Sequence, residues 1–308
     1  MLGAIAYLGI AFVSPFALVA VPLAVYLVAQ RPARRDAIVA VLVAAAAASL
    51  TLAGPADPFA ALEGAWLVLL AGALGIVLVA RPGRSFVPAA LLVLALAAGA
   101  AALLVWLTPL SWPEVTWRVT RHFGLQARVL LGQITQAAEA AGGDAPAFAA
   151  TLERSVESGI RMASGVFPAL LLLQSFAALA LAWTLYQRVA RAPQGAPLAR
   201  LREFRFDDNL IWGIVLALVG VLVPRIVGVG VLGGNLAVFF GGLYTVRGVA
   251  VVAALAAAAG IEGLLATAGA TLIVLFLAPL AAMAALALGV TDTWVDWRRR
   301  LKRAAGPR

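Results

Sequence analysis

The sequence predicts an all-α fold, a polytopic transmembrane bundle of about eight helices. Of the 308 residues, 64% are hydrophobic and only 12% are charged, and the mean hydropathy is +1.01, which excludes an ordinary soluble domain with a polar surface. The apolar residues gather into runs of roughly 18 to 30 residues, long enough to cross about 30 Å of hydrocarbon. Residues 91–107 form one such run without a charged side chain. We expect a single integral membrane domain over 1–308, located in a bacterial inner membrane.

Eight apolar segments are predicted as spans, an N-terminal group over 1–108 and a C-terminal group over 162–308 that ends in a basic tail. The first segment is expected to be bent or split at Ser14-Pro15 and Pro22, because proline lacks an amide donor and clashes with the preceding turn. The segments lie near residues 3–29, 37–54, 60–80, 86–108, 162–187, 209–225, 234–258 and 263–290.

The interval 109–161, between the fourth and fifth spans, is the one long polar segment. In its first part Trp112 and Trp117 alternate with charged residues at a spacing that predicts an amphipathic helix at the membrane interface. A second helix is expected to begin near residue 145 and to continue unbroken through the membrane to about residue 190. Glu157 and Arg161 share a face of its polar first half, which a solvated helix explains better than a ligand site does.

Arginine clusters set the predicted topology. Three clusters contain most of the loop arginines and lie at 31–35, 81–84 and 188–205. The positive-inside rule places all three in the cytoplasm. The basic tail 298–303 conflicts with the span count, since three further spans after the last cluster would carry the tail to the opposite side. We give the tail's charge more weight and expect a re-entrant or extra crossing near 226–234 or Pro279.

Several classes of chemistry are excluded by what the chain lacks. It has no Cys and a single His, His122, so disulfides, thiolate chemistry and metal sites with two imidazoles are not available. No phosphate-binding loop, HExxH motif or GxSxG motif occurs. Topology explains the loop arginines without nucleic-acid binding. We therefore expect no enzyme activity, no metal, no cofactor and no nucleic-acid partner.

Arg247 is the charged residue that the apolar pattern explains least. An ionisable group in hydrocarbon costs a few kcal/mol, and Arg247 lies inside an apolar run with Tyr244 on the same helix face and Asn235 on a neighbouring one. Two interpretations stay open. Either the side chain extends to the lipid headgroups, or it is paired in the bundle interior and contributes to a solute site. The candidate acidic partners are Asp208, Glu262 and Asp292.

Polar residues in three other places are candidates for a role. Gln174, next to Ser175 in an apolar run, is either a solute contact or, more simply, part of an interhelical hydrogen bond. Asp207 and Asp208 stand at a span entrance and are expected to cap the helix. The stretch 291–303 has the composition of a membrane exit. Its candidate anchors for lipid or a partner protein are Trp294, Asp296, Trp297, Arg298 and Arg300.

Three motifs occur in the last third of the chain: FRFDDNLIW at 204–212, NLAVFFGGLYTVRGVAVV at 235–252 and GVTDTWVDWRRRLKR at 289–303. They resemble the YybS-like family of predicted bacterial membrane proteins, domain of unknown function 2232. In that family a Gln usually stands where this chain has Arg247, and a Pro often stands near Asp207. The N-terminal half distantly resembles energy-coupling-factor substrate-binding subunits and MreD-like proteins. The resemblance implies a membrane fold and location, and it implies no specific activity.

The predicted function is a transporter or substrate-binding membrane component for a small solute. Its candidate contacts are Arg247, Tyr244, Asn235 and Gln174. Because no ATPase motif is present, uptake would require a partner ATPase or an ion gradient. The alternative is a non-transporting scaffold, resembling MreD-like proteins, that recruits cytoplasmic or membrane proteins through 188–205 and the tail. The lipid bilayer is a partner in either case.

Overall fold

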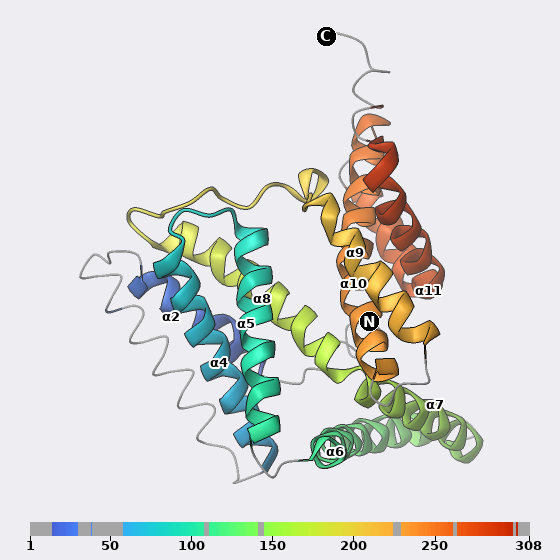
Figure 1. Ribbon diagram of the computed structural model, residues 1–308. Helices are drawn as coiled ribbons and strands as arrows, with labels where there is room; N and C mark the ends of the chain where they lie inside the picture. The colour runs from blue at the N-terminus through green and yellow to red at the C-terminus, as the bar shows by residue number, and fades with distance from the viewer. Residues whose placement is uncertain are drawn as a thin grey trace. The chain divides into compact units, whose positions relative to one another are not determined.

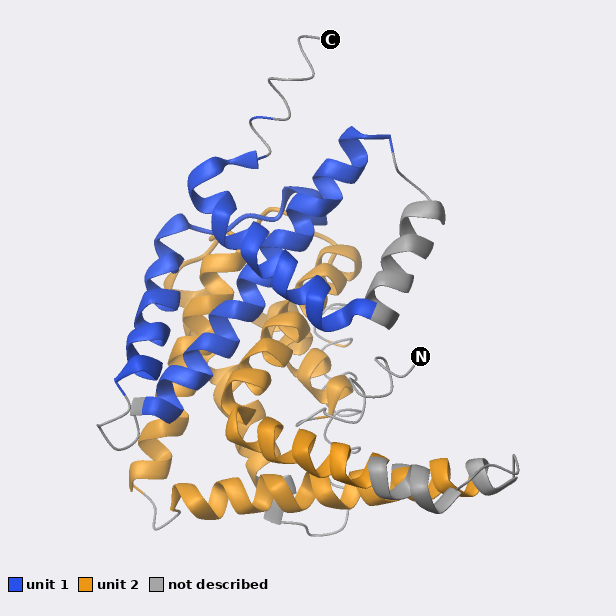
Figure 2. Cartoon of the chain, turned by 90° about the vertical axis from the view of Figure 1, so that its right-hand side faces the viewer, with its two compact units in different colours: residues 1–6, 198–308 blue, residues 7–197 orange. Residues whose placement is uncertain are grey.

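The computed structural model describes residues 14–29, 38, 58–107, 111–140, 145–223, 229–260, 264–297 and 300 (Figure 1). Every regular element in these ranges is a helix, which confirms the predicted all-α class. The chain divides into two compact units, an N-terminal unit of residues 7–197 and a C-terminal unit of residues 198–308 with 1–6 (Figure 2). Their boundary falls at residue 198, and not at the limits of the polar interval 109–161. The single membrane domain stays a prediction.

Five described helices are long and apolar enough to cross a membrane. They are Leu62–Ala80, Phe86–Leu107, Phe167–Val189, Gly230–Ala258 and Leu277–Val295. The predicted segment 209–225 differs, because its helix Asp208–Leu222 is one of two shorter apolar helices, the other being Pro15–Ala29. Apart from Ile38, the predicted span 37–54 lies outside the described residues.

Four apolar helices form the core of the N-terminal unit: α2 (Pro15–Ala29), α4 (Pro58–Ala80), α5 (Phe86–Leu107) and α8 (Phe167–Val189). Both α2 and α5 pack on α4 and α8. Each helix is apolar around its whole circumference, as expected where lipid and neighbouring helices are the only surroundings.

Aromatic rings gather around Trp183 of α8. Its ring lies 5.1 Å from that of Tyr26, 5.5 Å from that of Tyr186 and 6.3 Å from that of Phe86. Two of these rings have a polar atom that finds a partner in the segment after α8: the Trp183 indole donates to the carbonyl of Ala196, and the Tyr186 hydroxyl accepts from the Gln194 amide. A large apolar area is therefore buried while the polar atoms of Trp183 and Tyr186 stay hydrogen-bonded.

The start of the chain partly follows the expectation for prolines. α2 begins at Pro15, with the Ser14 hydroxyl accepting from the amide of Ala17, so a helix boundary does fall at Ser14-Pro15. Pro22 was expected to interrupt the helix, and this is wrong, because α2 continues through it. Residues 1–13 lie outside the described part of the chain.

Two amphipathic helices, α6 (Trp112–Ala140) and α7 (Ala145–Gly165), fill the predicted polar interval and pack on each other. The expectation of one unbroken helix from 145 to 190 is wrong. The chain leaves the helical conformation at Val166, and α8 starts at Phe167 with Pro168 in its first turn. Proline disfavours a helical conformation in the residues before it, which explains the break.

The C-terminal unit consists of two 3-10 turns, η1 (Leu201–Glu203) and η2 (Asp208–Leu210), and three helices. The helices are α9 (Ile211–Leu222), α10 (Val229–Ala258) and α11 (Leu264–Val295). α10 packs against α9, α11 and η1 (Figure 1). α11 is interrupted at Leu277, two residues before Pro279, where the backbone is not helical. The predicted irregularity near Pro279 is thus a kink inside a helix.

Small residues let α10 and α11 cross closely. A Cβ atom at Gly248 would overlap the carbonyl oxygen of Ala285, and one at Gly289 would overlap that of Tyr244. Ala285 and Gly289 are four residues apart and form a small-xxx-small surface, which membrane helices use to bring backbones together. This close approach brings the C-terminal end of α11 to the level of Arg247.

Candidate functional site

Arg247 lies at the centre of a charge cluster in the C-terminal unit. Its side chain is 0% exposed and contacts the carboxylates of two aspartates. Nε donates a hydrogen bond to Asp292 Oδ2 at 3.0 Å, and Nη1 lies 2.8 Å from Asp208 Oδ1. The second contact is an ion pair that is not aligned as a hydrogen bond. Full burial excludes the interpretation in which the guanidinium extends to the headgroups. Two of the three candidate partners are the ones observed, and Glu262 lies outside the described residues.

The turn before α9 gives its two aspartates different roles. The carboxylate of Asp207 accepts from the amide of Asn209 and caps η2, as predicted for this pair. Asp208 points away from the turn and bridges two arginines, with Oδ1 on Arg247 and Oδ2 3.1 Å from Nη2 of Arg205. Asp207 is therefore the cap, and Asp208 lies in the first turn, where a carboxylate interacts favourably with the helix dipole.

The end of α11 supplies the other two carboxylates. Asp292 occupies the last turn and is 1% exposed. Asp296 follows the helix with a φ of 45°, a left-handed conformation that ends helices and that Asp tolerates better than most residues. Its Oδ2 lies 3.3 Å from Nη1 of Arg205. Arg205 thus joins the start of α9 to the end of α11.

Two aromatic rings cover the guanidinium of Arg247. It lies 5.3 Å from the ring centre of Phe206 and 5.9 Å from that of Tyr244, and these two rings meet edge to face. Cation–π contacts of this kind strengthen when water is excluded. Phe206 was not singled out from the sequence, although its place in the FRFDD motif, two residues before Asp208, is a signal that could have found it.

The cluster as a whole carries a negative excess. Two guanidinium groups, of Arg205 and Arg247, face the three carboxylates of Asp208, Asp292 and Asp296. Partial burial acts against ionisation of Asp208, but Arg247 and Arg205 outweigh it and hold the pKa of Asp208 below its ordinary value. Burial likewise opposes the charge of Arg205, and Asp208 and Asp296 outweigh it and raise the pKa of that guanidinium. Among the described residues, no three acidic or histidine side chains are placed to hold a metal ion.

Nη2 of Arg247 is buried and has no hydrogen-bond partner in the described part of the chain. Such an atom costs free energy unless water or a solute reaches it. The hydrogen bonding of the cluster is therefore incomplete at Arg247.

The predicted solute contacts do not all meet. Arg247 and Tyr244 lie together, as described above. Asn235 lies about 18 Å further back along α10 by helical rise, and its amide donates to the Val231 carbonyl of its own helix. Gln174 belongs to α8 of the N-terminal unit, where its neighbour Ser175 accepts a 3.0 Å hydrogen bond from the Trp66 indole. An interhelical hydrogen bond is thus present at the residue next to Gln174.

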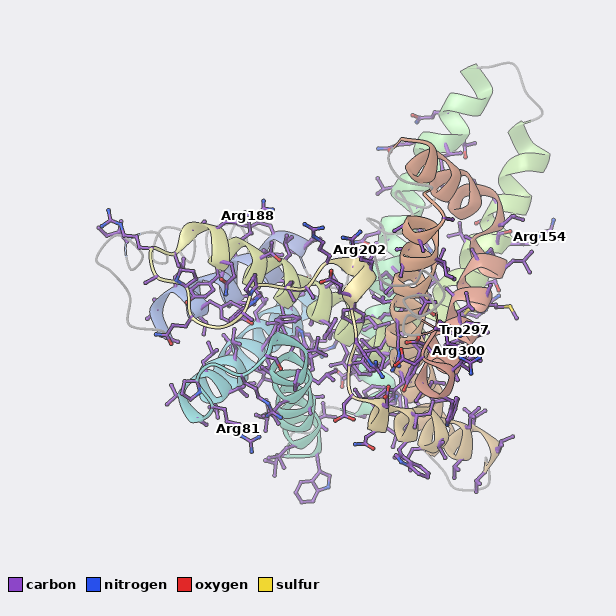
Figure 3. The ribbon with its side chains drawn as sticks, turned by 90° about the horizontal axis from the view of Figure 1, so that it is seen from above. Arg81, Arg154, Arg188, Arg202, Trp297 and Arg300 are labelled. Carbon is purple, nitrogen blue, oxygen red and sulfur yellow. The ribbon has the colours of Figure 1, made fainter. Side chains whose placement is uncertain are left out.

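The exit sequence of α11 lies at the same end of the C-terminal unit as the segment before α9. The contact between Arg205 and Asp296 establishes this, and Figure 3 labels Arg202, Trp297 and Arg300 in these two segments. Arg202 and Arg205 belong to the last predicted cytoplasmic cluster. This placement therefore agrees with the expectation, based on the charge of the tail, that the tail lies on the same side of the membrane. Trp294 is 69% exposed, which suits the anchoring role predicted for it. Arg298 lies outside the described residues.

A family model described as "Predicted membrane protein (DUF2232)" matches residues 1–293 of this chain. The match confirms the resemblance carried by the three motifs of the last third and extends it through the N-terminal half. It does not show the more distant likeness to energy-coupling-factor subunits or MreD-like proteins, which stays a prediction. No curated protein and no solved structure matches this chain at a significant level.

Proposed function

Because this chain belongs to the DUF2232 family of predicted membrane proteins, we propose that it acts in the bilayer as a transport component for a small solute. In this proposal the charge cluster of Arg205, Asp208, Arg247, Asp292 and Asp296 is a gate at one end of the C-terminal unit. The proposal includes no enzymatic step, and it places the protein in the inner membrane of a bacterium.

The observation that carries the proposal is the fully buried Arg247, which ties together the start of α9 and the end of α11. A buried ion pair stabilises a fold little more than apolar packing of the same volume, so its presence calls for another reason. Ionisable groups inside membrane domains mark pathways for solutes and ions. Short and broken helices flank such sites in transporters, and here α9 is short while α11 breaks at Leu277.

The geometry changes the role that the sequence suggests for Arg247. Asp208 and Asp292 already balance its charge, so an anionic solute would have to displace a carboxylate to bind there. A gate that opens when these ion pairs separate fits the arrangement better. Nη2 of Arg247, which lacks a hydrogen-bond partner among the described residues, would then be satisfied in the open form.

Transport can be tested without knowing the solute. Proteoliposomes would be loaded with a small-molecule extract of bacterial cells, and mass spectrometry would identify the solutes retained with time. We expect vesicles with the native chain to lose a defined set of solutes that protein-free vesicles keep. Arg247→Gln should abolish this selective loss, because it removes the charge whose ion pairs with Asp208 and Asp292 form and separate as the gate closes and opens.

Arg202→Gln is the matched control, since it removes an exposed arginine of η1 outside the cluster and should behave as the native chain does. Both variants must enter vesicles in equal amounts and with equal helical content. Identical retention in native and protein-free vesicles would contradict transport, and unchanged selective loss in Arg247→Gln would contradict the gate.

A scaffold that recruits cytoplasmic proteins is the second candidate. It is favoured by the exposed Trp294 of α11 and by Trp297 and Arg300, which follow that helix in the sequence (Figure 3). Aromatic and arginine side chains are enriched where proteins bind one another. Truncation after residue 297 separates the two proposals. Loss of co-purifying proteins with no effect on solute retention would support the scaffold, and the reverse result would support transport.

A further inference from the structure

The α6–α7 pair of the N-terminal unit forms a groove that the proposed function does not use. Thr120, Arg121 and Arg128 of α6 and Glu157 and Arg161 of α7 contribute to its lining, and its volume is about 510 Å³. We propose that this groove binds the phosphate group of an anionic bilayer lipid.

The charges of the groove favour an anion. Three guanidinium groups line it against the single carboxylate of Glu157. That carboxylate lies 3.7 Å from Nη1 of Arg161, and both side chains are exposed, so it neutralises the arginine only in part. Arginine suits phosphate because its planar fork of donors matches two phosphate oxygens at once.

The arginines are held at a spacing that leaves room between them. Arg121 and Arg128 are seven residues apart on α6, so they share a face about 10 Å apart along the axis. The guanidinium of Arg121 lies 5.3 Å from the ring centre of Trp117, a contact that restrains it. Gly124 stands between the two arginines. A Cβ atom added at Gly124 would meet no other atom within 4 Å, so the groove is open at this position.

Apolar side chains beside the groove favour a lipid over a free anion. Leu125 lines the groove and is exposed. Three large apolar side chains elsewhere on the two helices are also exposed: Trp117 and Val129 on α6 and Met162 on α7. Helices that combine arginines with exposed large apolar residues lie in the headgroup region of a bilayer. A lipid whose phosphate is bound between the arginines would place its acyl chains against these side chains.

Native mass spectrometry of the full chain in detergent tests the proposal. The chain would be titrated with short-chain phosphatidylglycerol or phosphatidylcholine at equal concentrations. With about 1 kcal/mol for each arginine near a lipid phosphate, we expect at least about a tenfold preference for phosphatidylglycerol. Arg128→Gln and Arg161→Gln should each weaken phosphatidylglycerol binding about fivefold.

Two further variants keep the test independent of folding. Glu157→Gln removes the one carboxylate of the groove and should tighten binding about fivefold, a gain that unfolding cannot produce. Arg154→Gln removes an arginine that Figure 3 labels, seven residues before Arg161 on α7. Arg154 does not contribute to the lining of this groove, so the substitution should leave the affinity unchanged.

Three outcomes would overturn the assignment. The two lipids could bind equally, and because both contain a phosphate but only phosphatidylglycerol has a net negative charge, this would show that the groove does not select an anionic lipid. Arg154→Gln could weaken binding as much as Arg161→Gln, which would show general electrostatic attraction. Inorganic phosphate could displace phosphatidylglycerol at matched concentration, which would identify a site for a free anion.

Discussion

The Arg247 cluster of the C-terminal unit and the Trp183 cluster of the N-terminal unit are both buried between helices, but different forces hold them. Trp183 packs against other aromatic rings, and the polar atoms of the Trp183 and Tyr186 rings reach a neighbouring backbone segment. Arg247 is held by carboxylates that come from two other elements. The first arrangement depends on shape and area, and the second depends on every charge keeping its partner.

This difference predicts where each unit is vulnerable. Removing one group from a set of packed rings leaves a cavity, whose cost depends on how far the neighbours relax. Removing Asp292 from the Arg247 cluster leaves Nε of a buried guanidinium without its acceptor, and relaxation cannot supply a new carboxylate. The charge cluster should therefore respond more sharply to single substitutions and should be rescued by paired ones.

Asp292→Ala is expected to have the largest effect. Because Asp292 is 1% exposed and pairs directly with Arg247, its loss should destabilise the protein by about 3–5 kcal/mol. The midpoint of unfolding by SDS in mixed micelles would measure this. The double variant Asp292→Leu with Arg247→Met should recover most of the stability. If Asp292→Ala were as stable as the native chain, the ion pair between Asp292 and Arg247 would not contribute to the stability of the fold.

Gly248→Ala should have the next largest effect. The added Cβ would overlap the carbonyl of Ala285 and push α10 and α11 apart, at a cost of about 1–3 kcal/mol. Gly241→Ala on the same helix is the matched control, because a Cβ there meets no atom within 4 Å and alanine favours a helix over glycine. Equal unfolding midpoints for the two variants would contradict the close crossing.

Ser175→Ala in the N-terminal unit should have a smaller effect. It leaves the Trp66 indole without its 3.0 Å acceptor, and interhelical hydrogen bonds in membranes contribute about 0.6 kcal/mol on average and up to about 1.7. The same unfolding assay would measure it. A loss as large as that of Asp292→Ala would show that the two units respond alike, against the comparison drawn above.

The response to acid should be the smallest effect. The pKa of Asp208 in the folded protein lies below its ordinary value of 3.8, so ionised Asp208 stabilises the fold above that pH. This contribution is lost as the pH falls through the lowered pKa. The effect is modest because the side chain is 43% exposed. Between about pH 6 and pH 3 the native chain should lose more stability than Asp208→Asn. Parallel curves of stability against pH for the two proteins would show that ionised Asp208 does not stabilise the cluster.

Much of the fold could be predicted from hydropathy alone. The helices α4, α5 and α8 fall close to the predicted spans, because a run of about 20 apolar residues in a membrane has few alternatives to a helix. The break at Val166 and the continuation of α2 through Pro22 could not be predicted in the same way. Both depend on whether a proline falls where a helix can accommodate it, which neighbouring helices help to decide.

The candidate site shows the same division. Arg247 can be identified from sequence because a charge in an apolar run is costly wherever its partner lies. Arg205 and Asp296 could not be recognised as members of the cluster, because both belong to charged segments that topology explains. Asn235 was selected as a neighbour of Arg247, but an amide is inexpensive enough to be satisfied within one helix, as its bond to the Val231 carbonyl shows.

By itself the sequence determined that this protein lies in a membrane, that it is helical, and that one arginine in its last third must reach either lipid headgroups or a polar partner. These features follow from the cost of placing polar groups in hydrocarbon, which each residue carries wherever it is in the fold. Only the tertiary structure decided that Asp208 and Asp292 meet that arginine, and that Arg205 and Asp296 complete the cluster. Contacts between segments up to 91 residues apart depend on how helices cross, and at this crossing Gly248 and Gly289 set the distance.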